Sequence, residues 1–209
     1  MYRSEAINLI SSRLGQRSGL DNQIKTEMLL AQTELERSPW LPWFLLAEDT
    51  NLTTVAEQRT VDVPSDFLME YEDIPIYLTD TDGEEYQLTK DDYDALASDT
   101  YIEDSGRPTH YDLVGAKWYF FPEPDAAYSL RVFYYAAAQT LDQEEDLENA
   151  WLAYAPDLLI AKTGLAMARF LRDNAAIQLF AADLQKAEQR VLQLDTARKE
   201  AARAVFMGG

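Results

Sequence analysis

The sequence predicts an α+β protein in which a β-rich insertion interrupts a four-helix bundle. Near both ends of the chain, apolar residues recur every three or four positions, as on one face of a helix. Between them lie short β-branched and aromatic runs separated by turn residues, and most of the acidic residues. We therefore expect N-terminal helices in residues 1–40, an acidic insertion in 41–146, and C-terminal helices with a docking tail in 147–209, forming one structural unit with 1–40.

Two amphipathic helices are expected before the insertion. The first covers residues 4–17, where Ser4 suits the N-cap position. Asp21 suits the start of the second helix, whose apolar face carries Ile24, Met28, Ala31 and Leu35. Pro39 and Pro42 end this helix, because proline lacks an N–H and disfavours helix in the residue before it.

The insertion is expected to consist of short strands joined by turns. Strands are expected over residues 52–55, 59–63 and 74–78. The dipeptide Asp82-Gly83 lies between the apolar runs 76–78 and 86–88, which predicts a β-hairpin. A short helix is expected over residues 91–97. The aromatic and β-branched runs 109–113, 117–121 and 128–135 then predict an antiparallel meander.

Helix returns after the insertion, with Asp146 or Asn149 as its cap. Pro156 either opens a new helix or kinks a longer one, and the residues after it are apolar on much of the helix circumference, so a central position is expected. No Gly or Pro interrupts residues 174–207, and about 33 helical residues would span roughly 50 Å. A domain of this size is roughly 35 Å wide. Part of this last helix should therefore project beyond its core or pack on another copy.

The charge excludes several classes of function. The chain has 37 Asp and Glu residues against 18 Lys and Arg residues, a net charge of -19. Residues 1–40 have zero net charge, residues 41–150 have -21, and residues 151–209 have +2. A general nucleic-acid clamp is excluded because phosphate binding requires Lys and Arg. The chain has no cysteine, so no disulfide and no cysteine-based zinc site is expected. It has no apolar run long enough for a membrane span, and its start is unlike a signal peptide, so neither a span nor a signal peptide is expected.

Catalytic motifs are not found in the sequence. His110 is the only histidine and is expected to be a strand residue at a surface or subunit contact. Acid pairs are abundant, but a chain with 37 acids offers many by accident. Residues 80–85 faintly resemble a calcium loop, yet the Asp-Gly hairpin accounts for them more simply. We therefore predict no catalytic, cofactor-binding or metal-binding residues.

Five short sequence segments, in the order given below, resemble the head-to-tail adaptor family of short-tailed bacteriophages. Members of this family are also called connector, tail accessory or gatekeeper proteins. They are Val63-Pro64-Ser65-Asp66-Phe67-Leu68, Ser105-Gly106-Arg107-Pro108-Thr109-His110-Tyr111, Phe121-Pro122-Glu123-Pro124-Asp125, Tyr128-Ser129-Leu130-Arg131-Val132-Phe133-Tyr134-Tyr135 and Ala155-Pro156-Asp157-Leu158-Leu159. The resemblance extends from the first helix to Phe206.

The resemblance implies a structural virion protein without catalytic residues. Such a protein forms a ring, typically of twelve copies, under the portal protein after DNA packaging. The ring extends the DNA channel, closes the packaged head and provides the docking platform for the tail nozzle or tubular tail protein. Its expected location is the virion, with the host cytoplasm before assembly. Genomic DNA would pass through without specific binding, and no membrane partner or cofactor is expected.

Two sets of residues become candidates for these contacts. The basic and apolar end of the last helix is expected to bind the portal through Arg198, Lys199, Arg203, Val205, Phe206 and Met207. Acidic residues of the insertion would face the channel or the tail, namely Asp80, Asp82, Glu84, Glu85, Asp91 and Asp92. The alternative for this acidic set is a solvated face that keeps the protein soluble.

Two other functions remain open at this point. The first is a peptidoglycan-degrading, muramidase-like activity that uses paired carboxylates. It requires two carboxylates facing across a cleft, one of them buried with a raised pKa. The second is a non-viral acidic oligomeric scaffold.

Overall fold

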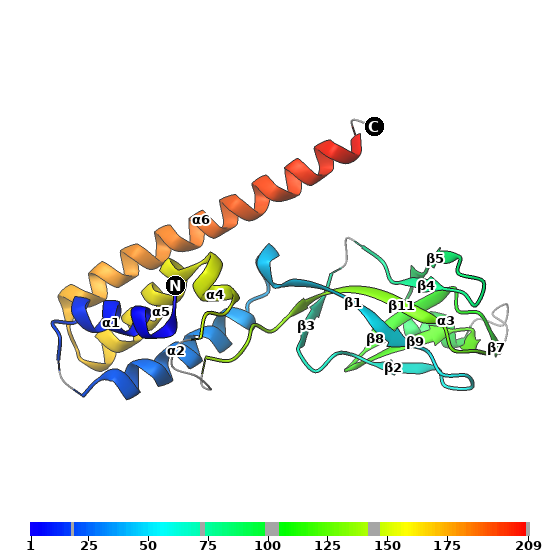
Figure 1. Ribbon diagram of the computed structural model, residues 1–209, viewed down its shortest axis with the longest axis horizontal. Coiled ribbons are helices and arrows are strands. Elements are labelled where there is room, and N and C mark those ends of the chain that lie inside the picture. The colour runs from blue at the N-terminus through cyan, green and yellow to red at the C-terminus, as the bar shows by residue number, and fades with distance from the viewer. Residues whose placement is uncertain (18, 72–73, 99–104, 142–146, 208–209) are drawn as a thin grey trace. The chain divides into compact units, whose positions relative to one another are not determined.

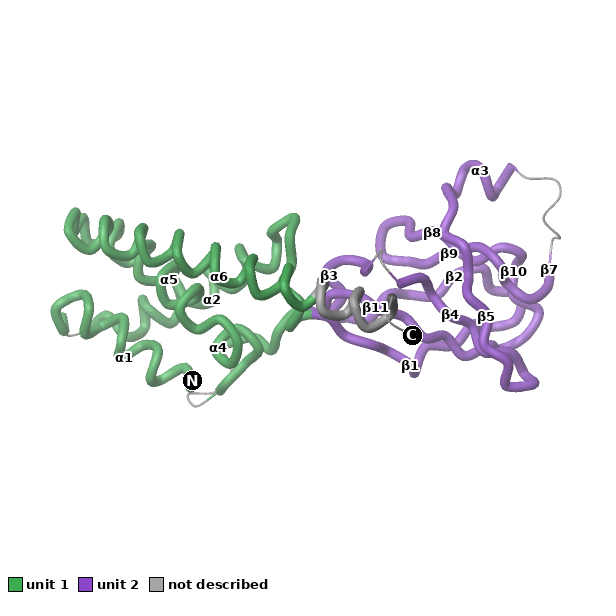
Figure 2. The backbone as a smooth tube through the Cα atoms, turned by 90° about the horizontal axis from the view of Figure 1, so that it is seen from above, with its two compact units in different colours: residues 1–45, 137–209 green, residues 46–136 purple. Residues whose placement is uncertain are grey.

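The computed structural model describes residues 1–17, 19–71, 74–98, 105–141 and 147–207, with side chains described as far as Arg198. It has the predicted α+β class. The chain divides into two compact units, which Figure 2 shows in different colours. A helical unit comprises Met1–Leu45 and Ala137–Gly209, and a β unit comprises Leu46–Ala136. The insertion therefore begins five residues later and ends ten residues earlier than the 41–146 that we expected.

The helical unit is built around one central helix (Figure 1). Its elements are α1 (Arg3–Arg13), α2 (Asp21–Glu36), the 3-10 helix η1 (Trp43–Leu45), α4 (Ala150–Tyr154), α5 (Pro156–Phe170) and α6 (Asn174–Met207). Helix α5 packs against α1, α2, α4 and α6. Because two helices, α4 and α5, and not one, precede α6 after the insertion, the arrangement of a four-helix bundle is not confirmed.

Local sequence signals set most of the helix ends. Asn149 caps α4, since its side chain accepts a hydrogen bond of 3.1 Å from the N–H of Leu152. Pro156 opens α5 in the first turn, where its missing N–H needs no partner. The expectation of Ser4 as a cap was wrong. Helix α1 starts at Arg3, because the carboxylate of Glu5 accepts a 2.8 Å hydrogen bond from the backbone N–H of Tyr2.

Helix α6 has 34 residues, close to the predicted length, and its first half packs against α5. In Figure 1 its second half extends beyond the other helices of the unit. Phe180, Ala187 and Val191 are buried, as the helical spacing predicts. Beyond them the same spacing of three and four residues predicts that Leu194 is buried, and this prediction was wrong: Leu194 is half-exposed, and Asp195 is buried in its place. The spacing of apolar residues cannot reveal that Asp195 is buried, because the burial of this carboxylate depends on a polar partner elsewhere in the unit.

The β unit contains two main sheets that enclose a common core. Its strands are β1 (Leu46–Thr53), β2 (Thr60–Asp62), β3 (Phe67–Glu70), β4 (Tyr77–Thr79), β5 (Glu85–Gln87), β6 (Thr89–Lys90), β7 (Ser105–Gly106), β8 (His110–Val114), β9 (Lys117–Phe121), β10 (Glu123–Pro124) and β11 (Ser129–Ala136), and its helix is α3 (Tyr93–Ser98). One sheet has the order β1-β11-β4-β5, with β3 also paired to β11, and the other has the order β2-β9-β8-β6. Leu78 and Leu130 of the first sheet meet Trp118 and Phe120 of the second in one buried cluster.

The predicted hairpin is confirmed, and the predicted meander is only partly correct. Strands β4 and β5 pair antiparallel, with Leu78 opposite Tyr86. Gly83 adopts a φ of +83° in the turn, a backbone conformation that glycine accepts without steric conflict. Strands β8 and β9 also pair antiparallel, but β11 leaves them and joins β1, β3 and β4. Pro122 and Pro124 supply no N–H to a ladder, which favours the exit of the chain from that sheet.

The contact between α5 and α6 gives a first prediction. A Cβ atom at Gly164 would overlap the ring of Phe180, which is fully buried. Overpacking costs about 1–3 kcal/mol, more than the roughly 1 kcal/mol that alanine gains over glycine in a helix. We expect Gly164→Ala to lower the free energy of unfolding, as measured by denaturant titration. In a Phe180→Leu background the same change should be much less harmful. Equal losses in both backgrounds would contradict this packing.

Candidate functional site

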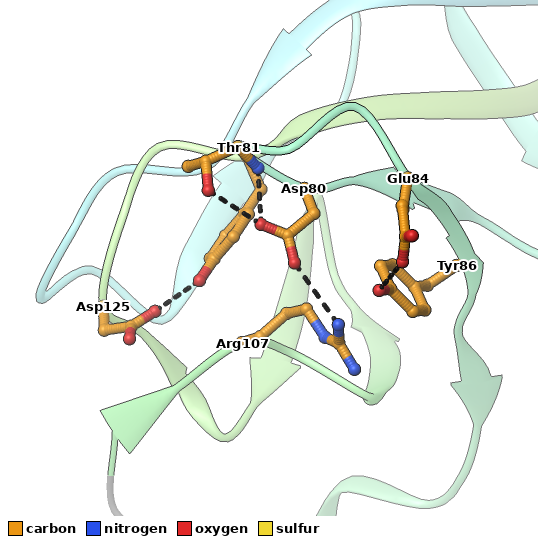
Figure 3. Close-up of polar contacts among 7 residues, drawn as sticks. Asp80, Thr81, Glu84, Tyr86, Arg107 and Asp125 are labelled. Atoms are coloured by element: carbon orange, nitrogen blue, oxygen red, sulfur yellow. Dashed lines mark hydrogen bonds and ion pairs between the residues drawn. The ribbon is translucent and has the colours of Figure 1, made fainter.

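The predicted acidic set begins at the β4–β5 hairpin, where Asp80 has three polar contacts (Figure 3). One carboxylate oxygen accepts hydrogen bonds from the backbone N–H of Thr81 and, at 3.0 Å, from its hydroxyl. The other oxygen lies 3.3 Å from Nη1 of Arg107. The hydrogen bonds of the Thr81 side chain and backbone, and then the Arg107 guanidinium, hold the pKa of Asp80 below its ordinary value.

Arginine side chains engage two further acids of this set, Glu84 through the ring of Tyr86 and Glu85 directly. The guanidinium of Arg107 stacks over the ring of Tyr86, 3.7 Å from its centroid. The hydroxyl of Tyr86 donates a 2.6 Å hydrogen bond to Glu84, and this bond raises the pKa of Tyr86. Arg131 donates two hydrogen bonds, of 2.9 and 2.6 Å, to Glu85. Sequence reasoning identified the acids but missed both arginines, because the partners are 27 and 46 residues away.

The other three acids of the set are exposed. Asp82 lies in the turn of the hairpin. Asp92 accepts hydrogen bonds from the N–H groups of Asp94 and Ala95 and so caps the start of α3. Asp91 lies 3.6 Å from Nε2 of His110. The structure therefore groups Asp80, Asp82, Glu84 and Glu85 on one hairpin and places Asp91 and Asp92 at the entry to α3.

Every basic residue of the β unit is paired within the unit. Residues 46–136 contain 21 acids and five bases, a net charge of -16. The pairs are Arg59 with Glu123, Lys90 with Glu70, Arg107 with Asp80, Lys117 with Asp62, and Arg131 with Glu85. Except for the buried Glu70, these side chains are partly or fully exposed, and exposed pairs contribute little to stability. Their consequence is electrostatic, because the positive charges are neutralised and the remaining carboxylates determine the sign of the surface.

The predicted portal-binding set begins inside the helical unit. The guanidinium of Arg198 lies over the ring of Trp43, 3.4 Å from its centroid. The backbone N–H of Trp43 donates a 3.0 Å hydrogen bond to the buried carboxylate of Asp195, one turn earlier in α6. Sequence reasoning missed Trp43 and Asp195 as partners. Lys199, Arg203, Val205, Phe206 and Met207 continue the helix, and their side chains lie outside the described residues.

The titratable groups of the described residues do not show the pattern expected of a muramidase. Two carboxyl groups among them have shifted pKa values, Glu34 and Asp80, and both values are lowered. In Glu34 the cause is the hydrogen bond and charge of Lys162. Among the described residues, no group of acids and histidine is arranged to hold a metal ion. No helix within the described residues is both long and apolar enough to cross a membrane.

A helical unit, an acidic β insertion and a last helix more than twice as long as any other in the unit define a two-unit α+β protein with the layout of a structural adaptor. The family model described as SU10 adaptor protein matches residues 3–206. The match spans nearly the whole chain, so the chain belongs to the SU10 adaptor family, and the resemblance to phage head-to-tail adaptors is confirmed. A search of curated proteins gave no match.

The contact between Asp195 and Trp43 gives a second prediction. Asp195→Ala removes the acceptor of the Trp43 N–H, and a hydrogen bond to a charged group contributes about 1.5–3 kcal/mol. We expect the free energy of unfolding to fall by about 1–2 kcal/mol, since alanine recovers part of the loss through its helix propensity. Asp195→Asn keeps an acceptor and should lose less. An unchanged midpoint for Asp195→Ala in a denaturant titration would disprove the role of this contact.

The hairpin gives a third prediction, on pH dependence. Thr81→Val removes the hydroxyl donor to Asp80, so the pKa of Asp80 should rise towards its ordinary value. A carboxyl with a lowered folded-state pKa stabilises the fold above its unfolded pKa, and this contribution is lost as pH falls through the folded pKa. The stability difference between wild type and Thr81→Val should therefore shrink on acidification. An NMR titration of the Asp80 carboxyl carbon measures the shift, and identical titration curves would contradict it.

Proposed function

We propose that the chain forms a ring beneath the portal of a phage head, where it extends the DNA channel, closes the packaged head and docks the tail. The observation that carries this proposal is the family match over residues 3–206. The ring has about twelve copies by the resemblance stated above. Its partners are the portal protein on one side and a tail nozzle or tubular tail protein on the other. The protein acts in the virion and is present in the host cytoplasm before assembly.

The charge of the β unit supports a place next to DNA or at its exit. A channel should let a polyanion pass without holding it, and phosphates are held by unpaired Lys and Arg. All five bases of the unit are already paired with its own acids. We propose that some of Asp80, Asp82, Glu84, Glu85, Asp91 and Asp92 face the channel or the tail. Their repulsion acts within a Debye length of about 8 Å.

The helical unit suits the portal side of the ring. It contains 16 acids and 13 bases, so its net charge is only -3. Its last helix continues past the contact of Arg198 with Trp43 into a basic and apolar sequence. We propose that Lys199, Arg203, Val205, Phe206 and Met207 bind the portal. Arg198 joins them from its place on Trp43 at the base of this segment.

Mixing the purified protein with its cognate portal tests the function directly. The free 23.8 kDa chain should be monomeric, because a ring formed early would compete with packaging for the portal. With the portal, native mass spectrometry should show about twelve bound copies per portal ring. Removal of residues 199–209 should weaken portal binding at least tenfold, whereas removal of Gly208 and Gly209 alone should not. Persistent monomer beside an unchanged portal would refute the proposal.

A further inference from the structure

Helix α6 exposes leucine side chains on both sides of its buried stripe. Leu192 is 45% exposed on one side, whereas Leu179 and Leu194 are 48% and 49% exposed on the other. At 3.6 residues per turn, Leu192 and Leu179 point about 100° to either side of the buried Phe180 and Val191. The helical unit therefore has two separate apolar surfaces on one helix.

The surface on the Leu192 side is a groove. Two hollows, of about 280 and 260 Å³, lie along α2, α5 and α6, and consecutive residues of α2, Glu34 and Leu35, line one each. Leu184 lines the first hollow and Leu192 the second, two turns further along α6. Leu30 of α2, which is 50% exposed, and Trp40 also belong to the apolar lining. We call this surface the α2–α6 groove. Its charged lining residues are three acids, Glu27, Glu34 and Glu188, and two bases, Lys162 and Arg169.

The surface on the opposite side has the complementary sign. Leu179, Lys186, Arg190 and Leu194 share this side at spacings of seven, four and four residues, and we call them the outer flank of α6. The hollow beside it, of about 330 Å³, is lined by three bases, Arg13, Lys186 and Arg190, and two acids, Asp157 and Asp183. Arg13 pairs with Asp183 and Arg190 pairs with Asp157. Lys186 has no ion-pair partner among the described residues, which leaves this side with one positive charge in excess.

We propose that the outer flank of α6 in one copy packs into the α2–α6 groove of the next copy. Leucines would then cover leucines, and the side with an excess base would face the side with an excess acid. Because the two surfaces differ, the contact is heterologous, and repetition in one direction closes a ring when the rotation allows. This inference rests on the proposed ring and names the surfaces that build it. It leaves the residues after Arg198 free for the portal.

Single cysteines in this cysteine-free chain test the contact without background. Leu192→Cys marks the groove, and Leu179→Cys or Leu194→Cys marks the outer flank, so that either helix direction is covered. A short bismaleimide should cross-link the groove variant to at least one flank variant when the two are mixed in the presence of the cognate portal. Each variant alone should stay uncross-linked. Gln189→Cys, which is exposed two and a half turns after Phe180 and so lies on the side of α6 away from its buried stripe, is the matched control and should not react with the groove variant.

Charge reversal supplies a second readout. Lys186→Glu with Arg190→Glu reverses the flank, and Glu27→Lys with Glu188→Lys reverses the groove. Each double variant alone should lose at least tenfold in ring yield on the portal. An equimolar mixture should recover the ring, with alternating copies, because each altered surface then meets an oppositely charged partner.

The outcomes separate this inference from the proposed function. Rings on the portal that form without any groove-to-flank cross-link would overturn the inference and leave the function intact. Cross-links of the groove to itself, to the portal or to the C-terminal segment would also overturn it. If wild-type protein never joins the portal, the proposed function fails. In that case, cross-linking of the free protein at high concentration tests the groove-to-flank contact without the portal.

Discussion

The packing of α6 against α5 is the contact on which the helical unit depends. Gly164 lets the ring of Phe180 approach the backbone of α5, and this approach fixes the position of α6 along its length. Because a helix is stiff, that one contact also determines where Asp195 and Arg198 lie four to five turns later. They meet Trp43, the first residue of η1, just before the chain enters the β unit. The same packing leaves the outer flank of α6, and its side in the α2–α6 groove, exposed.

The two units divide the charge in a way that suits different partners. Acids of the β unit outnumber its bases by about four to one, and each base is engaged by a carboxylate of the same unit. Several of these arginines also lie over aromatic rings, so their positive charge is held against the unit and is not offered to a phosphate. The nearly neutral helical unit keeps opposite charges on the two sides of its last helix. This division of charge supports the proposal that the helices make the protein contacts and that the strands face the DNA.

The features that the sequence predicted are those with local causes. The length of α6, the hairpin at Asp82-Gly83, the cap at Asn149 and the helix start at Pro156 each depend on residues within a few positions of one another. The features that it missed depend on distant partners. Strand β11 leaves the expected meander because β1 and β4 are available to it, and Asp195 is buried because Trp43 donates to it. The candidate acids could be named from the sequence, but their arginine partners required the fold.

The central claim is that this chain builds a ring on a portal. A cryo-EM map of the cognate portal incubated with the full-length protein tests it most directly. We expect a coaxial ring of copies, with the helical units against the portal and the outer flank of each α6 in the neighbouring α2–α6 groove. A map of the bare portal, or of copies bound singly without contact to one another, would contradict it.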